Sequence, residues 1–310
     1  MTWWEALILG IVQGLTEFFP VSSSGHLVMM QELLGLRIPG ISFEIAVHLA
    51  TLISVLVVYR QRIARLALGA VGRHEENSWP YLLQLALATL PAVLAVLLFG
   101  DWIEARFDDP AFTGTMLLVT GSFLWSTRWV RSAARPRAVE LLPIVAAALV
   151  ALLAGTLVHF LGVAALLALI MGVSRAVTRP GWREEAGWGG ALAMGVAQAV
   201  AIFPGISRSG STVVTGLWKR IDGVAAAEFS FLMSVVAITG AAVQKTPEML
   251  AQGVGVAPVP LAVGFLAAAV SGVLAIRFFV AMLRKQSFYS FAYYCWVVGA
   301  LFLWHVRSGG

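Results

Sequence analysis

Long apolar runs, separated by short polar segments, make up most of the chain. Six of these runs come close to or exceed the ~20 residues that a helix needs to cross a hydrocarbon layer of about 30 Å. They lie at residues 42–60, 81–100, 112–130, 225–244, 259–283 and 289–306. This pattern predicts an all-α polytopic membrane protein.

A further apolar stretch at residues 141–173 does not fit a single span. As one helix it would be about 50 Å long at 1.5 Å per residue, too long for one ordinary crossing and short for two. Gly155 and the segment around His159 suit a tight turn. We therefore expect an extra apolar hairpin within an inserted segment at 138–185, followed there by a basic linker.

Two stretches, at about 9–33 and 193–217, break the apolar pattern with proline, glycine and a run of serines. Irregular backbone at membrane depth is tolerated only where protein buries it or where it lines a watery cavity. Both stretches are therefore predicted to be re-entrant, broken-helix hairpins rather than lipid-facing spans.

The two broken stretches are copies of each other. Six residues of the first recur in the second with a constant offset of 185 positions: Gly10, Gln13, Phe18, Ser22, Ser24 and Gly25 match Gly195, Gln198, Phe203, Ser207, Ser209 and Gly210. Each copy is followed by three apolar runs, which divides the chain into repeats at 1–137 and 186–310. The positions of the charges predict inverted topology, an arrangement that brings two broken segments together near the midplane of the membrane.

Composition and charge support a membrane location. Apolar residues make up 59% of the chain and charged residues 12%, whereas soluble domains carry about 25% charged residues. The net charge of +5 comes from short basic clusters between the apolar runs, which is typical of cytoplasmic loops, so nucleic acid is not an expected partner. All basic clusters lie on the same side of the membrane only if residues 141–173 cross the membrane and return. The single cysteine, Cys295, excludes an intrachain disulfide and a cysteine-based metal site.

The first broken stretch concentrates reactive side chains. Gln13 and Glu17 stand four residues apart and share a helix face, and Ser22, Ser23, Ser24, Gly25 and His26 follow within ten residues of Glu17. Ionisable groups at membrane depth are costly and are functional candidates by default. The alternative is a serine-rich turn that satisfies its own backbone beside an interfacial histidine.

The second stretch has the composition of an anion site. Arg208 carries a permanent charge with forked donors that suit phosphate oxygens, and residues leading into a helix expose backbone N–H groups. Its neighbours that could contribute are Gly205, Ser207, Ser209, Gly210 and Thr212. The alternative for Arg208 is an interfacial anchor. Glu44 and Glu228, which begin corresponding runs, could be hydrogen-bond partners, metal ligands or structural caps.

At these residues the chain resembles the undecaprenyl-diphosphate phosphatases of the bacitracin-resistance type. The resemblance lies in Gln13–His26 (QGLTEFFPVSSSGH) and Pro204–Thr212 (PGISRSGST), and it extends over most of the chain outside 138–185. It implies a membrane hydrolase that converts undecaprenyl diphosphate to undecaprenyl phosphate plus phosphate, which recycles the lipid carrier for cell-wall synthesis and confers bacitracin resistance. We expect the insertion at 141–173 to lengthen the chain beyond the usual member and to leave the exact number of spans open.

The resemblance also implies roles for individual residues. Glu17 would bind a divalent metal or act as acid and base; Ser23 would be the nucleophile or position the attacking water; His26 would be the general base or a rival nucleophile; and Arg208 would clamp the diphosphate. The supporting set would comprise Ser22, Ser24, Gly25, Gly205, Ser207, Ser209, Gly210, Thr212, Gln13, Glu44 and Glu228. Two positions depart from the family pattern, Gln13 in place of an acid and Ser24 where threonine is common.

Cofactor, partner and location follow from the same resemblance. The expected cofactor is Mg²⁺ or Ca²⁺, which suits carboxylate and phosphate ligands. The expected partners are a polyprenyl diphosphate and membrane lipid, with a homodimer left open, and the expected location is the plasma or inner membrane with the site opening outward. A secondary transporter or lipid flippase is the alternative function, because inverted repeats with broken helices characterise transporters.

Overall fold

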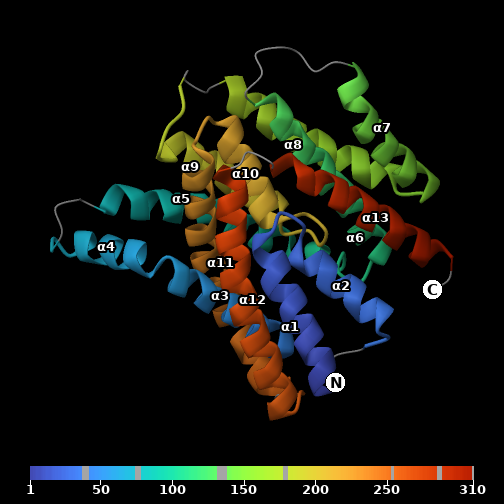
Figure 1. Ribbon diagram of the computed structural model, residues 1–310, viewed down its shortest axis with the longest axis horizontal. Helices are drawn as coiled ribbons and strands as arrows, with labels where there is room; N and C mark the ends of the chain where they lie inside the picture. The colour runs from blue at the N-terminus through green and yellow to red at the C-terminus, as the bar shows by residue number, and fades with distance from the viewer. Residues whose placement is uncertain are drawn as a thin grey trace.

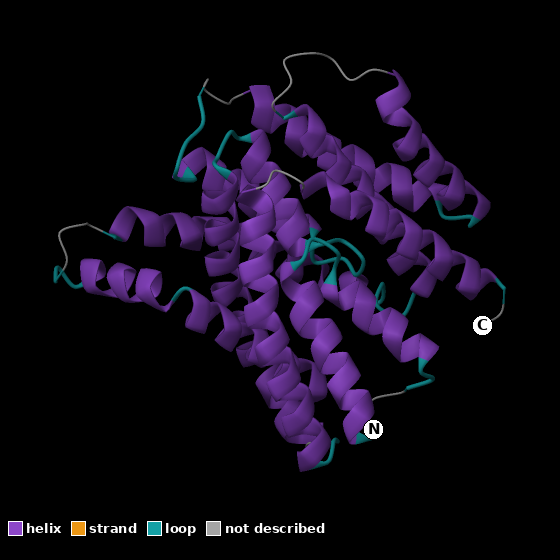
Figure 2. Ribbon diagram, in the orientation of Figure 1, coloured by secondary structure: helices purple, strands orange, loops and turns teal. Residues whose placement is uncertain are grey.

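The computed structural model describes residues 1–36, 42–73, 78–130, 138–176, 181–252, 255–284 and 288–308, and these residues are mostly helical (Figures 1 and 2). Their only strand-like pairing is one isolated β-bridge between Arg183 and Ile221. The all-α prediction is confirmed.

The first repeat begins with the hairpin α1 (Trp3–Phe18) and α2 (Ser23–Leu33). Three longer units follow: α3 (Ser42–Val58) with α4 (Arg60–Ala70), then α5 (Trp79–Glu104), then α6 (Pro110–Trp125) with the 3-10 turn η1 (Ser126–Trp129). The predicted re-entrant segment is therefore a pair of short helices joined at Phe19–Ser22.

The second repeat has the same order. It consists of the hairpin α9 (Gly187–Val200) and α10 (Arg208–Trp218), then α11 (Gly223–Gln252), α12 (Pro258–Arg284), η2 (Phe288–Ser290) and α13 (Phe291–Arg307). Between the repeats stand α7 (Ala138–Leu153) and α8 (Leu157–Ala176), joined by a short turn with Gly155 at φ +69°. These two helices form the apolar hairpin that the sequence predicts.

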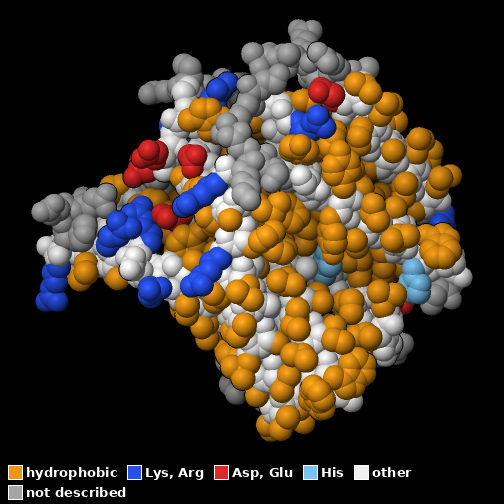
Figure 3. Space-filling model, in the orientation of Figure 1, with side chains coloured by type: hydrophobic (Ala, Val, Ile, Leu, Met, Phe, Trp, Pro, Cys, Tyr) orange, Lys and Arg blue, Asp and Glu red, His pale blue; other side chains and the backbone are white. Residues whose placement is uncertain are grey.

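Four described helices are long and apolar enough to cross a membrane, or five if the bent pair α3–α4 counts as one span. The sequence predicts six crossings. The missing one is α6, which has only 16 residues and is buried from Phe112 to Trp125. Hydrophobic side chains cover most of the face in Figure 3, and the charged groups there gather toward its upper and left parts, as expected for a protein surrounded by lipid.

One sequence expectation is wrong. The basic segment after residue 60, interpreted as a loop, is the helix α4, bent by 76° from α3. Its arginines alternate with apolar positions, so that Leu66 is buried while Arg65 is exposed, and such a basic amphipathic helix suits a membrane surface. Arg62 anchors α4 through an ion pair with Glu228 of α11 (2.9 Å) and a cation–π contact with Tyr81.

The first helix of each repeat packs against a long helix of the other repeat. α1 packs against α12 of the second repeat, while α9 packs against α5 of the first, and α6 packs against α13 (Figure 1). Each first helix thus contacts the second long helix of the other half. This reciprocal packing is what a two-fold relation between the repeats predicts, and it buries both broken hairpins.

Matching glycines permit this packing. A Cβ added at Gly10 would lie 2.3 Å from the Gly264 carbonyl oxygen on α12, and one added at Gly195 would lie 2.4 Å from the Ala88 carbonyl oxygen on α5. Both distances are far inside van der Waals contact with rigid backbone. The repeated glycine is therefore explained by close helix approach at two equivalent interfaces.

We expect Gly10→Val and Gly195→Val each to destabilise the protein by about 1–3 kcal/mol, the usual range for overpacking a tight contact. Gly162→Val on α8 is the matched control, because nothing lies within 4 Å of a Cβ there. Thermal unfolding in detergent measures the effect. Equal melting temperatures for all three variants would contradict the packing argument.

Candidate active site

The two broken hairpins start their second helices in the same way. Ser22 caps α2 by accepting a hydrogen bond from the Gly25 N–H (3.3 Å), and Ser207 caps α10 by accepting one from the Gly210 N–H (3.0 Å). Serine is among the preferred N-cap residues because its hydroxyl satisfies a free backbone N–H. The repeated serines and glycines therefore have a structural role in ending the break and starting a helix.

The two breaks also contact each other. Ser22, held at φ +69°, accepts a second hydrogen bond from the Gly205 N–H across the repeats (3.1 Å). In the opposite direction, Ser209 donates to the carbonyl oxygen of Phe19 (3.0 Å). Gly205 itself adopts φ +91° and lies against the carbonyl of Thr113, so only glycine fits there. The contacts close two irregular loops against each other and bury their polar groups.

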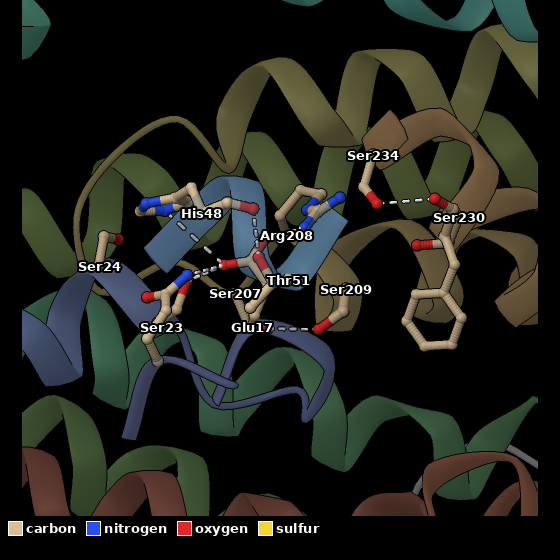
Figure 4. Close-up of polar contacts among 12 residues, drawn as sticks. Glu17, Ser23, Ser24, His48, Thr51, Ser207, Arg208, Ser209, Ser230 and Ser234 are labelled. Carbon is tan, nitrogen blue, oxygen red and sulfur yellow. Dashed lines mark hydrogen bonds and ion pairs between the residues drawn. The ribbon is translucent and has the colours of Figure 1, made fainter. Parts of the chain in front are cut away.

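Glu17, near the end of α1, is the centre of the polar contacts (Figure 4). Its Oε2 accepts hydrogen bonds from Ser23 Oγ (2.5 Å) and Gln13 Nε2 (3.0 Å), and its Oε1 forms an ion pair with Arg208. His48 Nε2 lies 3.9 Å from Oε2. The Glu17 side chain is only 6% exposed, so its charge is held by these partners from both repeats.

A cavity of about 280 Å³ opens beside Glu17. Its polar lining is Glu17, Ser22, Ser23, Ser24, Glu44, His48, Ser207 and Arg208, with Thr16 beside them. Ser23 is the first residue of α2 and Arg208 the first residue of α10. Two helix N-termini therefore converge on one cavity, each contributing backbone N–H groups and the positive end of its dipole. The arrangement is suited to bind an anion with several oxygens.

The two histidines differ in availability. His26 Nδ1 must donate to the Ser22 carbonyl (2.8 Å), so the neutral ring's Nε2 accepts from Tyr294 Oη (2.7 Å). His48 Nδ1 likewise donates to the Glu44 carbonyl (2.8 Å), but its Nε2 has no hydrogen-bond donor among the described residues and faces the cavity. His48 thus lines the cavity, whereas His26, for which the resemblance implies the role of general base or rival nucleophile, does not.

The predicted site residues separate into two groups. The structure brings Glu17, Ser22, Ser23, Ser24, Glu44, Ser207 and Arg208 to the cavity lining, and Gln13 supports Glu17 from behind. His26, Gly25, Gly205, Ser209, Gly210, Thr212 and Glu228 are not among the lining residues. Glu228 binds Arg62 instead, and Thr212 Oγ1 contacts Ser230 Oγ at 2.6 Å.

Oxygen ligands for a divalent cation are present, although no preformed cluster of three or more His, Cys, Asp or Glu side chains exists in the described part of the chain. Glu17 and Glu44 both line the cavity, and Gln13 Oε1 is buried without a partner. Mg²⁺ commonly binds one or two carboxylates and takes its remaining ligands from phosphates and water. The residues therefore fit a cation that arrives with a phosphorylated ligand.

The buried ion pair gives a stability prediction. Glu17→Gln leaves Arg208, whose side chain is 17% exposed, without its counter-charge, and such a loss costs about 3–5 kcal/mol of unfolding free energy. Adding Arg208→Met should recover most of that loss. Ser23→Ala, which removes only a neutral donor to Glu17, should cost about 1 kcal/mol. Thermal melts of the single and double variants complete the cycle, and additive losses would contradict the pairing.

Comparison with known proteins extends over nearly the whole chain. A protein named undecaprenyl-diphosphatase from Salinibacter ruber is 37% identical over 319 aligned residues, covering 98% of this chain and 99% of its own. Proteins of the same name from Rubrobacter xylanophilus and Desulforapulum autotrophicum are 38% and 34% identical, covering 96% and 97% of this chain and 96% and 97% of their own. These relatives and this chain therefore match over nearly their whole lengths.

The family described as bacitracin resistance protein BacA matches residues 6–179 and 139–301 of this chain. These ranges include both broken hairpins, the segment 138–185 and every residue that lines the cavity. The resemblance seen in two short motifs thus extends to both repeats and to the helices that position them. The chain belongs to the BacA family.

Proposed function

We propose that the chain hydrolyses undecaprenyl diphosphate to undecaprenyl phosphate and phosphate. The main observation in support of this proposal is the position of the Glu17 carboxylate, which lies between Ser23 and Arg208 where two helix N-termini meet. A base, a hydroxyl and an anion clamp around one cavity meet the needs of phosphoryl transfer. The name undecaprenyl-diphosphatase, carried by relatives over nearly full length, supports the substrate.

The proposed first step uses Ser23 as the nucleophile. Its Oγ gives its proton to Glu17 Oε2, 2.5 Å away, and attacks the terminal phosphorus. The bond from that phosphorus to the bridging oxygen breaks, and the lipid monophosphate leaves with the bonding electrons. Arg208 and the N–H groups of the helix N-termini stabilise the charge on the transferring phosphoryl oxygens.

The second step removes the phosphoryl group from Ser23. A water attacks the phosphorus and gives one proton to His48 Nε2 at the cavity wall. The bond from the phosphorus to Ser23 Oγ breaks, Ser23 Oγ takes back the proton held by Glu17, and His48 then releases its proton to solvent. Free phosphate then leaves. His26 takes no part in this scheme, because both of its ring nitrogens are occupied by Ser22 and Tyr294; it holds α2 against α13.

We propose Mg²⁺ or Ca²⁺ as the cofactor, held by Glu17 and Glu44 at the cavity lining. When bound it would neutralise part of the diphosphate charge. Arg208 alone offsets only one of the charges that a diphosphate brings into a buried cavity. We therefore expect phosphate release to need a divalent cation and to stop when a chelator removes it.

The cavity is proposed to open at the outer face of the plasma or inner membrane. Phe107 lines it from what we call the acidic loop, residues 101–109, which comprise the last turn of α5 and the turn that follows and which carry Asp101, Glu104, Asp108 and Asp109. The basic segments that favour the cytoplasm lie elsewhere. An outward site would dephosphorylate lipid diphosphate at that face and return the carrier to cell-wall synthesis, and this activity would confer bacitracin resistance.

Phosphate release tests the function directly. The detergent-purified protein with Mg²⁺ should release phosphate from a C15 or C55 polyprenyl diphosphate. Ser23→Ala and Arg208→Ala should each lower kcat at least ~100-fold, the scale of losing one transition-state contact. Ser234→Ala is the control, since among the described residues its buried hydroxyl donates only to the Phe231 carbonyl and it lines neither cavity. No release by folded wild-type protein would reject the hydrolase and favour transport.

A separate measurement tests the orientation. The native Cys295 is fully buried, so the wild type should resist a membrane-impermeant maleimide. Asp108→Cys, at an exposed position of the acidic loop, should react on intact cells, whereas Arg65→Cys on α4 should react only after the membrane is opened. The reverse pattern would place the cavity on the cytoplasmic face.

A further inference from the structure

A second cavity continues from the one beside Glu17. It has a volume of about 600 Å³ and shares Glu17, Glu44, His48 and Arg208 with the first. Beyond these shared residues its walls are mostly apolar, formed by Ala92, Val93, Val96 and Leu97 on α5 and by Val236, Ala237, Ile238 and Ala241 on α11. The lining also includes Gln244 and Lys245 on α11. One continuous space therefore joins the charged cavity beside Glu17 to a mostly apolar part between α5 and α11, and we call this second part the α5–α11 groove.

Gln198, in the last turn of α9, lines this groove and is an exception to normal hydrogen bonding. It is 3% exposed, yet neither Oε1 nor Nε2 has a partner among the described residues. Buried amides nearly always find partners, and one that does not needs an explanation. Because no protein contact fixes the amide, it can turn its NH₂ group toward a ligand.

The repeat explains why Gln198 has no partner. Its counterpart Gln13 donates to Glu17, four residues later on the same helix face. Four residues after Gln198 the chain has Ile202, the counterpart of Glu17 at the offset of 185, so the second half keeps the amide and loses its acceptor. Arg208 also has a donor that is not used: its Nη2 binds Glu17, whereas its buried Nη1 has no partner among the described residues.

Two donors without hydrogen-bond partners among the described residues therefore belong to side chains that line the junction of the charged cavity and the α5–α11 groove. We propose, resting on the function above, that Gln198 Nε2 and Arg208 Nη1 bind the inner phosphate of the polyprenyl diphosphate, the one bonded to the lipid. The terminal phosphate lies at Ser23, the inner phosphate lies at the junction, and the first isoprene units follow the α5–α11 groove. Gln198 is thus a substrate-binding residue for the half of the diphosphate that stays on the product.

This assignment predicts which ligands lose affinity when Gln198 is substituted. The lipid monophosphate product keeps the inner phosphate, whereas inorganic phosphate represents the terminal one. A hydrogen bond to a charged group corresponds to a ~10- to 100-fold change in affinity. Gln198→Leu should therefore raise the inhibition constant of a C15 polyprenyl monophosphate ~10- to 100-fold and raise KM for the C15 diphosphate, while inhibition by inorganic phosphate stays unchanged.

Two controls separate binding from folding. Gln84→Leu removes another buried glutamine on α5 that lines neither cavity, and its kinetics should match the wild type. The melting temperature of Gln198→Leu should not fall, because an apolar side chain replaces an unpaired amide. Gln198→Glu should bind the monophosphate still more weakly than Gln198→Leu, since a carboxylate repels the phosphate.

Calorimetric binding of the C15 monophosphate to Ser23→Ala, with and without Gln198→Leu, gives the same comparison without catalysis. It decides the matter even if the wild type releases no phosphate, so failure of this inference is distinguishable from failure of the hydrolase. Unchanged monophosphate binding in Gln198→Leu would overturn the proposal. An equal loss for inorganic phosphate would overturn it too, because Gln198 would then contact the terminal phosphate.

Discussion

The ion pair between Glu17 and Arg208 is the interaction on which the rest of the site depends. Each partner comes from a different repeat, and each is largely buried. A lone charge at such depth is strongly unfavourable, so either partner alone would tend to disrupt the junction. The pair therefore ties assembly of the two halves to formation of the site: the carboxylate that orients Ser23 is paired and held in place only when the second hairpin is in position.

The ion pair in turn requires that the helical backbone is interrupted beside it in both hairpins, between α1 and α2 and between α9 and α10. Broken backbone at membrane depth needs its N–H and carbonyl groups satisfied by the protein, and here each break satisfies the other. Ser22 accepts from Gly205 and Ser209 donates to the Phe19 carbonyl. The close approach of α1 to α12 and of α9 to α5, made possible by Gly10 and Gly195, holds the two breaks at this distance. Repeat symmetry, helix packing and site geometry are thus parts of one constraint.

Much of this could be predicted from the sequence, because the signals are local. Run length predicts the long helices, the offset of 185 predicts paired hairpins, and the placement of Glu17, Ser23 and Arg208 at the breaks predicts a shared cavity. What the sequence could not settle depends on side-chain direction. His26 lies three residues after Ser23, yet its ring turns to Ser22 and Tyr294, while His48, on another helix, faces the cavity.

Glu228 illustrates the same limit. It repeats Glu44 in sequence, but the helix α4 brings Arg62 to it, and nothing local in the sequence shows that the basic segment folds back as a helix. The serines show a different ambiguity, because capping and phosphate binding favour the same residue types. Only the contacts show that Ser209 and Thr212 hold helices together while Ser23 and Ser24 line the cavity.

The two halves have diverged at the positions where chemistry needs asymmetry. At the constant offset, Glu17 corresponds to Ile202, Ser23 to Arg208 and His26 to Ser211, while the capping serines and the glutamines are kept. The first half therefore supplies the carboxylate of Glu17 and the hydroxyl of Ser23, and the second half supplies the guanidinium of Arg208. A diphosphate is itself asymmetric, with one phosphorus to be attacked and one to be retained. A cavity built from two fully identical halves would present the same groups to both phosphates, and in the function proposed above the differences between Glu17 and Ile202 and between Ser23 and Arg208 let the site distinguish them.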